Sequence, residues 1–256
     1  DGNSATTKVV LNEKDKAYVD VTDNLTFLKD NSFIWTSEKD GFNHIYLYDK
    51  TGKLKNQVTK GNWEVTNYYG FDEKSNTVFY QSVENGSINR DVYSINLNGK
   101  NKVRLSATTG TNAATFSPNF QYFINTFSNA TQPTTYTLNE AKTGAQVQVI
   151  EKNEALATKL KGYNLPAKEF FVLKTAKGNE LNAWILKPKD FDSSKKYPVL
   201  MYQYSGPGSQ QVNNDWNSAD DYWFQMLAQQ GYIVACVDGR GTGFKGADFK
   251  KVTQKE

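Results

Sequence analysis

Histidine and cysteine are almost absent from this chain of 256 residues, which contains one of each. The single cysteine, Cys236, excludes an intrachain disulfide, and its position inside an apolar run predicts a small buried residue rather than a reactive thiol. One cysteine does not decide the compartment, since it fits the cytosol and also a secreted protein with few disulfides. No cluster of cysteine and histidine has the spacing of metal ligands, and we expect no metal and no cofactor.

Long apolar runs and an excess of charge of one sign are also missing. No run approaches the roughly 20 apolar residues needed to cross a bilayer, and no signal-peptide pattern begins at Asp1. If the natural protein is exported, we expect its signal to lie outside this sequence. The net charge is +3 with basic and acidic residues interleaved, which predicts a solvated mixed surface and no nucleic-acid partner.

The common catalytic motifs are missing as well. There is no G-x-S-x-G nucleophile elbow and no P-loop, and the glycines of residues 239–243 have the wrong intervals for dinucleotide binding. The only histidine, His44, lies on a predicted strand, where a packed or solvated residue is a better interpretation than a catalytic base. The chain therefore has no complete catalytic set of its own.

Aromatic residues are plentiful, at 14% of the chain, and this favours β-rich structure. Three corresponding strands end at Ser37, Ser82 and Ser128, at spacings of 45 and 46 residues. Four strands per unit at such a period predict β-propeller blades, because the alternative, a β-sandwich, has no reason to repeat at one spacing. Three blades do not close a ring. The predicted strands are 25–28, 33–37, 44–48 and 55–59; 68–71, 78–82, 91–95 and 102–106; and 114–117, 124–128, 134–138 and 146–150.

Two further strands are predicted ahead of the first blade, at Thr7–Leu11 and at Tyr18–Val21, the second from its period-two alternation.

The pattern changes near Glu151, where we expect a domain boundary between residues 1–150 and 151–256. The second part is predicted to begin an α/β-hydrolase-like sheet. Trp223, Met226 and Leu227 are expected to form the apolar face of its amphipathic helix, and the last strand is expected to lack a partner. Its predicted elements are a helix at 154–160, a hairpin of strands 170–173 and 181–186, a strand at 197–204, the amphipathic helix at 222–231 and a buried strand at 232–237.

Tyr204 is the residue with the most chemical promise. It follows a strand of an open α/β sheet, and such sheets place their sites at the carboxyl ends of strands. A phenol hydroxyl there can donate a hydrogen bond to a developing oxyanion. From the residues alone, a tyrosine that merely packs at a strand end is the better explanation of the position.

Five segments in order along the chain resemble one family, the prolyl oligopeptidase family of serine peptidases, and within it the dipeptidyl peptidase IV branch. They are EKDGFNHIY at 38–46, TKGNWEV at 59–65, KYPVL at 196–200, YSGPGSQ at 204–210 and VDGRGTG at 237–243. The resemblance implies a propeller, usually eight-bladed in this branch, followed by an α/β-hydrolase domain. It also implies release of dipeptides with Pro or Ala in second position from free N-termini.

The resemblance assigns residue roles and absences. Tyr204 is expected to complete the oxyanion hole, and Asp238 and Arg240 to tie down neighbouring loops. The nucleophilic serine, the aspartate and the histidine of the family are expected beyond residue 256. The paired glutamates that bind the substrate amino group are expected on an earlier blade, which this sequence does not include. We therefore expect a fragment that is inactive by itself, with the last blades and the start of the hydrolase domain.

Peptides with a free N-terminus are the expected substrates of the intact enzyme. A homodimer and export to the periplasm or the extracellular space are also expected from the resemblance. Two alternatives stay open, namely a non-catalytic propeller that binds partners and an endopeptidase or acylaminoacyl peptidase of the same family.

Overall fold

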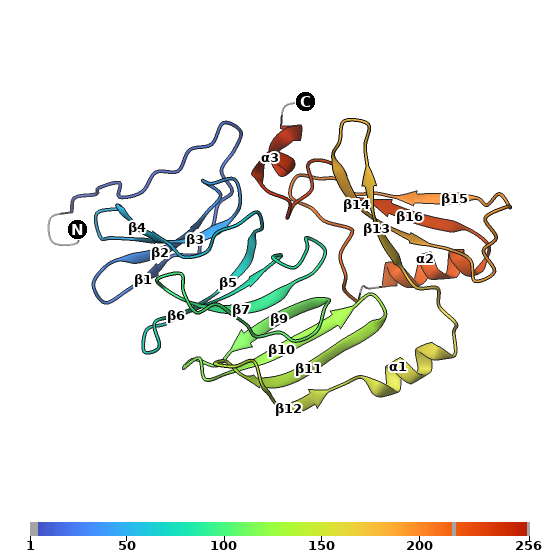
Figure 1. The fold of residues 1–256 in the computed structure, drawn as a ribbon, viewed down its shortest axis with the longest axis horizontal. Helices are drawn as coiled ribbons and strands as arrows, with labels where there is room; N and C mark the ends of the chain where they lie inside the picture. The colour runs from blue at the N-terminus through green and yellow to red at the C-terminus, as the bar shows by residue number, and fades with distance from the viewer. Residues whose placement is uncertain (1–4, 217–218, 255–256) are drawn as a thin grey trace.

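Four sheets of four strands each make up the computed structural model, which describes residues 5–216 and 219–254. Three of these sheets are entirely antiparallel, with their strands in sequence order. Figure 1 shows them following one another in an arc, with the fourth sheet beyond them. The three antiparallel sheets are blades of a β-propeller, as the repeat predicts.

Each blade has the four predicted strands, with a hairpin tip between the second and third and a tight turn between the third and fourth. The first blade contains β1 (Thr26–Phe27), β2 (Phe33–Ser37), β3 (His44–Tyr48) and β4 (Leu54–Gln57). The second contains β5 (Val65–Asp72), β6 (Thr77–Ser82), β7 (Asp91–Asn96) and β8 (Val103–Arg104). The third contains β9 (Thr111–Phe116), β10 (Tyr122–Asn129), β11 (Gln132–Glu140) and β12 (Gln146–Glu151).

Aromatic rings fill the spaces between neighbouring blades. The Trp63 ring, ahead of β5, lies 6.3 Å from the Tyr80 ring in a parallel arrangement. On the other side of the second blade, Phe79 stacks on Phe120, with ring centres 5.1 Å apart. The Phe116 ring is tilted against Phe79, with ring centres 4.7 Å apart. Such ring pairs add to the burial of apolar area, and they explain why the blade sequences are rich in aromatic residues.

The two strands predicted ahead of the first blade are wrong. Residues 6–15 and 18–25 have no regular secondary structure, and the side chains of Val9 and Val21 are 77% and 95% exposed. In the described residues, neither segment forms a strand that pairs with β1 or β4, the two edges of the first blade. A strand forms only where a neighbouring strand accepts its backbone hydrogen bonds, and alternation alone does not supply that neighbour.

The fourth sheet has the order β13, β14, β16, β15. The strands β15 and β16 are parallel, and the other pairs are antiparallel. The last strand, β16, therefore lies inside the sheet with a partner on each side, which corrects the expectation that it would lack one. The strands are β13 (Glu169–Lys174), β14 (Glu180–Leu186), β15 (Val199–Tyr202) and β16 (Ile233–Val237).

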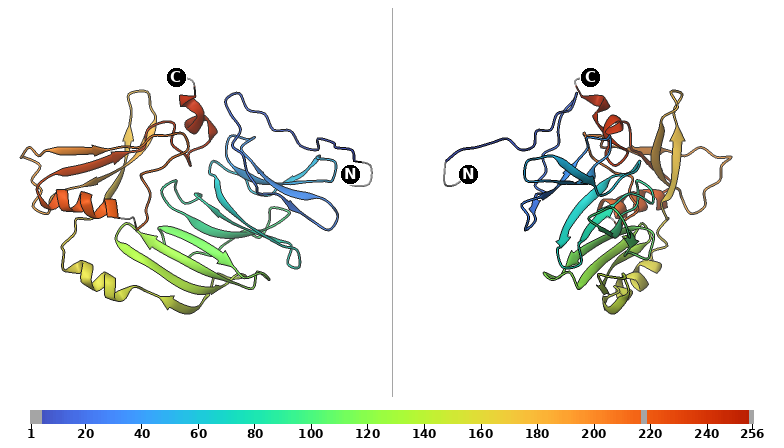
Figure 2. Two further views of the ribbon diagram at one scale, coloured as in Figure 1. Left: turned by 180° about the vertical axis from the view of Figure 1, so that it is seen from behind. Right: turned by 60° about the vertical axis from the view of Figure 1, so that its left-hand side comes forward.

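Short helices connect and flank the sheets. The helix α1 (Glu154–Lys161) leads from the third blade toward the fourth sheet, and α2 (Ala219–Gln229) packs on that sheet. The helix α3 (Ala247–Lys250) continues into a 3₁₀ turn, η1 (Lys251–Thr253), and both views in Figure 2 place α3 beside the first blade. No helix in the described residues is long and apolar enough to cross a bilayer.

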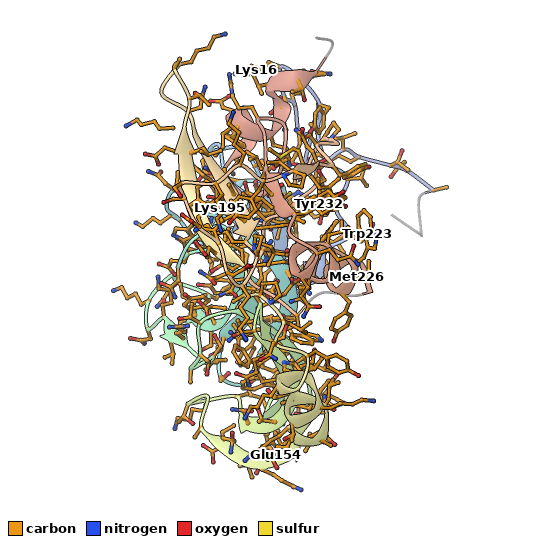
Figure 3. All side chains as sticks on the ribbon, turned by 90° about the vertical axis from the view of Figure 1, so that its right-hand side faces the viewer. Lys16, Glu154, Lys195, Trp223, Met226 and Tyr232 are labelled. Atoms are coloured by element: carbon orange, nitrogen blue, oxygen red, sulfur yellow. The ribbon has the colours of Figure 1, made fainter. Side chains whose placement is uncertain are left out.

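The buried face of α2 differs from the predicted one. Phe224 and Ala228 are buried and Leu227 packs beside them, whereas Trp223 and Met226 are 49% and 43% exposed. Figure 3 shows Trp223 and Met226 at the surface. Residues at i, i+3 and i+4 define two overlapping apolar stripes on this helix. The packing against the fourth sheet selects the stripe that starts at Phe224.

His44 has a structural role in the first blade. Its side chain is fully buried, with Nδ1 3.1 Å from Oγ1 of Thr59 and Nε2 2.9 Å from the carbonyl oxygen of Gly61. Its ring is nearly perpendicular to the Trp63 ring, and the two ring centres are 4.8 Å apart. Burial lowers the pKa of His44, because the charged imidazolium is poorly solvated there. The interpretation of His44 as a packed blade residue is confirmed.

We expect acid to destabilise the chain through His44. Since the folded-state pKa lies below the ordinary value of 6.5, the unfolded chain binds a proton first as the pH falls. The unfolding free energy is then highest above pH 6.5 and should fall by about 1 kcal/mol per pH unit just below it. Urea unfolding at pH 7.0, 6.0 and 5.5 measures this.

The matched control is the variant His44→Asn, which keeps every carboxylate. Buried carboxyls with raised pKa, such as Glu64, act with the opposite sign in both proteins. The difference between the proteins therefore isolates the histidine. The same pH dependence in both would show that His44 does not control this window.

Candidate active site

Tyr204 lies two residues beyond β15, at the carboxyl end of the parallel strand pair. Its side chain is 60% exposed, and its hydroxyl has no hydrogen-bond partner among the described residues. The ring lies against Gly206, where an added Cβ would stand 3.0 Å from the phenol oxygen. The hydroxyl is therefore free to bind a ligand, and a residue larger than glycine at position 206 would push the ring aside.

The loop after Tyr204 packs tightly on the loop after β16. The Gly208 amide donates to the carbonyl of Gly241 at 3.0 Å, and the Gly243 amide donates to the carbonyl of Ser209 at 2.9 Å. A Cβ on Gly243 would lie 2.7 Å from the carbonyl oxygen of Gly208. The two backbones approach this closely only because position 243 has no side chain. We call residues 205–209 the tyrosine loop and residues 239–243 the glycine loop.

Asp238 secures the segment that follows the tyrosine loop. Its buried carboxylate accepts hydrogen bonds from the amides of Gln211 at 3.0 Å and Val212 at 2.9 Å. Burial raises its pKa, while the bonds from these two amides favour the charged form and oppose the rise. The expected tying role of Asp238 agrees with these contacts. Arg240 is exposed and has no hydrogen bond or ion pair within the described residues, so the structure gives it no such role.

Residues 210–216 join the fourth sheet to the blades, a contact that the sequence interpretation missed. The Asn214 amide donates to the carbonyl of Ile88 at 2.8 Å, and its side chain donates to Oδ1 of Asn89 at 3.0 Å. The Trp216 amide donates to Oγ of Ser128 at 3.1 Å. The sequence pattern indicates no more than a polar connection in this segment. Its density of glutamine and asparagine was the available signal, since amide side chains both donate and accept.

A second contact, between the segment that follows β16 and the N-terminal part of the chain, consists of ion pairs. Lys250 pairs with Asp20 and Glu38, and Lys251 pairs with Glu38 at 2.9 Å and with Asp15 at 3.0 Å. Both lysine side chains are nearly buried. No sequence pattern connects these positions, which are more than 200 residues apart.

A buried carboxylate reinforces this second contact. Glu64 accepts a hydrogen bond at 2.7 Å from the amide of Gly246, where α3 begins, and burial raises its pKa. The first blade and the segment that follows it are therefore joined to residues 246–251 by ion pairs, by this hydrogen bond, and by one from the Ala247 amide to the carbonyl of Gly41 at 2.8 Å.

Metal-binding clusters are missing from the part of the chain that the structure describes. Within residues 5–216 and 219–254, no three His, Cys, Asp or Glu side chains are grouped so as to hold a metal ion. Cys236 is fully buried, and burial raises its pKa to about 12. The prediction of a buried core cysteine is confirmed.

Residues 1–134 match the family model of the dipeptidyl peptidase IV (DPP IV) N-terminal region. The chain belongs to this family. The crystal structure of Porphyromonas gingivalis dipeptidyl peptidase 4 superposes with a TM-score of 0.92 and 48% identity, over 98% of this chain and 35% of that one.

Sequence relatives point the same way. Dipeptidyl peptidase 4 of Arthroderma otae is 34% identical over 230 residues, and that of Trichophyton rubrum is 33% identical over 228 residues. Each alignment covers 87% of this chain and 29% of the relative. The chain thus spans less than a third of the length of these relatives. The family predicted from the five motifs is confirmed.

Gly243→Ala should separate the tyrosine loop from the glycine loop. The added methyl group would overlap the Gly208 carbonyl, and relief of such overpacking costs about 1–3 kcal/mol. We expect a lower urea midpoint and faster hydrogen exchange at the amides of Gly208 and Gly243.

Gly239→Ala is the matched control in the same loop. A Cβ there has no neighbour nearer than 3.7 Å, so its stability should stay within about 0.5 kcal/mol of the parent. If the two variants were equally stable, the close approach at Gly243 would not constrain the loops.

Proposed function

We propose that this chain is part of a serine-type dipeptidyl peptidase that releases X-Pro or X-Ala dipeptides from peptides with a free N-terminus. Membership of the DPP IV family supports a peptidase, and the relatives that carry the name dipeptidyl peptidase 4 support the class of product. The observation within the chain that carries the proposal is the exposed hydroxyl of Tyr204 at the carboxyl end of β15, which no described residue binds.

Tyr204 is proposed as one arm of the oxyanion hole. When a serine attacks the scissile carbonyl, the carbonyl oxygen gains negative charge, and a preplaced donor stabilises that charge more than it stabilises the substrate. The phenol hydroxyl supplies one donor and a backbone amide supplies the other. A histidine takes the serine proton and later returns it to the leaving amine, and an aspartate orients the histidine.

The serine, histidine and aspartate of this scheme are proposed to lie outside this stretch of 256 residues. The sequence has no G-x-S-x-G elbow. Its only histidine is buried, and both ring nitrogens have partners, so it is unavailable as a base. The paired glutamates for the substrate amino group are likewise proposed to lie outside this chain.

The fourth sheet is proposed as the start of the α/β-hydrolase domain, with the boundary near residue 151. The parallel pair of β15 and β16 and the helix α2 between them support this, because such a unit is the building block of open α/β sheets. The last blade strand ends at Glu151. Export and a homodimer of the complete enzyme are part of the same proposal and rest on the family resemblance.

The purified chain of 256 residues should not release product from a chromogenic Gly-Pro amide, because it lacks the nucleophile and its base. The complete protein should release it. Hydrolysis by the chain alone would contradict the proposed division of the catalytic residues. Absence of hydrolysis by the complete protein would favour one of the two alternatives, a non-catalytic propeller or an endopeptidase or acylaminoacyl peptidase.

Tyr204→Phe in the complete enzyme should lower kcat by roughly 10²-fold with little change in KM, since the hydroxyl acts on the transition state. Steady-state kinetics on the same substrate measures this. Tyr232→Phe is the matched control, because Tyr232 is also partly exposed but precedes β16 at the opposite end of the strand pair. Equal kinetics of both variants would remove Tyr204 from the mechanism.

A further inference from the structure

Arg90 is a half-buried cation that the proposed reaction does not use. It precedes β7 on the second blade and contacts the segments that follow β15 and β16. Its Nη2 donates to Oε1 of Gln210 at 2.6 Å, and its guanidinium lies 4.2 Å from the centre of the Phe244 ring. Gln210 also donates from Nε2 to the carbonyl of Ser87 at 2.8 Å, so its amide group is held at both ends.

The surroundings of Arg90 are unusual for an arginine, because no carboxylate forms an ion pair with it in the described residues. Its Nη1 donates instead to the carbonyls of Ser87 at 3.0 Å and Asn89 at 2.9 Å. Burial lowers its pKa to about 10. A buried charge is costly unless its donors are used, and here the planar group is used as a rigid fork.

Two of the groups that Arg90 contacts adjoin the two loops of the site. Gln210 directly follows the tyrosine loop, and Phe244 directly follows the glycine loop. Phe244 has a φ of 67°, a left-handed conformation that a large side chain adopts only when its neighbours hold it there. Arg90, whose guanidinium lies over the Phe244 ring, is one such neighbour. One side chain of the propeller therefore contacts residues adjoining both loops.

We propose that Arg90 is a positioning residue for Tyr204, holding the tyrosine loop against the glycine loop through Gln210 and Phe244. This rests on the proposed oxyanion role of Tyr204. The path is short. Gln210 adjoins Ser209, whose Oγ donates to the carbonyl of Tyr204 at 3.2 Å and whose own carbonyl accepts from Gly243. A small displacement of a catalytic donor costs a large factor in rate.

The first test measures the loops without using activity. In the complete protein, Arg90→Met keeps the length of the side chain but removes the fork and the charge. We expect hydrogen exchange at the amides of Gly208, Ser209 and Gly243 to become at least about tenfold faster, with the β6 and β7 amides unchanged. Lys102→Met on the same blade is the control, since Lys102 pairs with Glu84 away from both loops. Unchanged exchange in Arg90→Met overturns the proposal.

The second test is a double-mutant cycle in the complete enzyme. Arg90→Met should lower kcat by about tenfold or more with KM within about twofold. In a Tyr204→Phe background the same change should have almost no further effect, because the group it positions is already missing. Losses that multiply in the double variant would show a merely structural role and overturn the proposal.

The outcomes separate the two proposals. If Tyr204→Phe is fully active, or the complete protein has no peptidase activity, the proposed function fails, and the exchange experiment alone decides whether Arg90 holds the loops. Should Arg90→Met not fold, Arg90→Lys takes its place. It keeps the charge but loses the fork, so it should show the same non-additive loss of kcat to a smaller extent. A multiplicative loss in that variant also overturns the inference.

Discussion

The segment 210–216 lies between the fourth sheet and the second and third blades, and its backbone amides find partners on both sides. Asp238 accepts from two of its amides, and the carbonyl of Ile88 accepts from a third. Leaving one such group unpaired costs about 1–3 kcal/mol. The sheet and the blades are therefore coupled through this segment, and the position of Tyr204 depends on both.

The second connection has a different chemistry and lies at a different place. At α3, Lys250 and Lys251 pair with carboxylates of the first blade and of the segment before it. Ion pairs depend on charge and on solvent screening, whereas the amide contacts of 210–216 depend on geometry. Two separated connections of this kind fix the orientation of the fourth sheet against the blades more firmly than one could.

For the proposed reaction, this arrangement means that a propeller can contribute to catalysis without touching the reacting atoms. The proposed oxyanion donor, Tyr204, directly precedes the tyrosine loop. This loop lies against the glycine loop at Gly243, and Gln210, which follows it, is hydrogen-bonded to Arg90 of the second blade. An oxyanion donor acts through its placement. Under this proposal, blade residues such as Arg90 support the reaction by positioning the oxyanion donor, in addition to stabilising the fold.

The sequence by itself determined the blades, the hairpin of β13 and β14, and the family. These follow from local signals, namely alternation, turn residues and contiguous motifs that each segment carries alone. Only the tertiary structure decided that Thr7–Leu11 and Tyr18–Val21 pair with no strand, that α2 buries Phe224 rather than Trp223, and that residues 210–216 and Lys250 join the two halves. Each of these outcomes depends on which part of the folded chain packs against the segment. A strand needs a neighbour for its backbone, a helix with two apolar stripes buries the one that its support covers, and a polar side chain takes its role from the partner it meets.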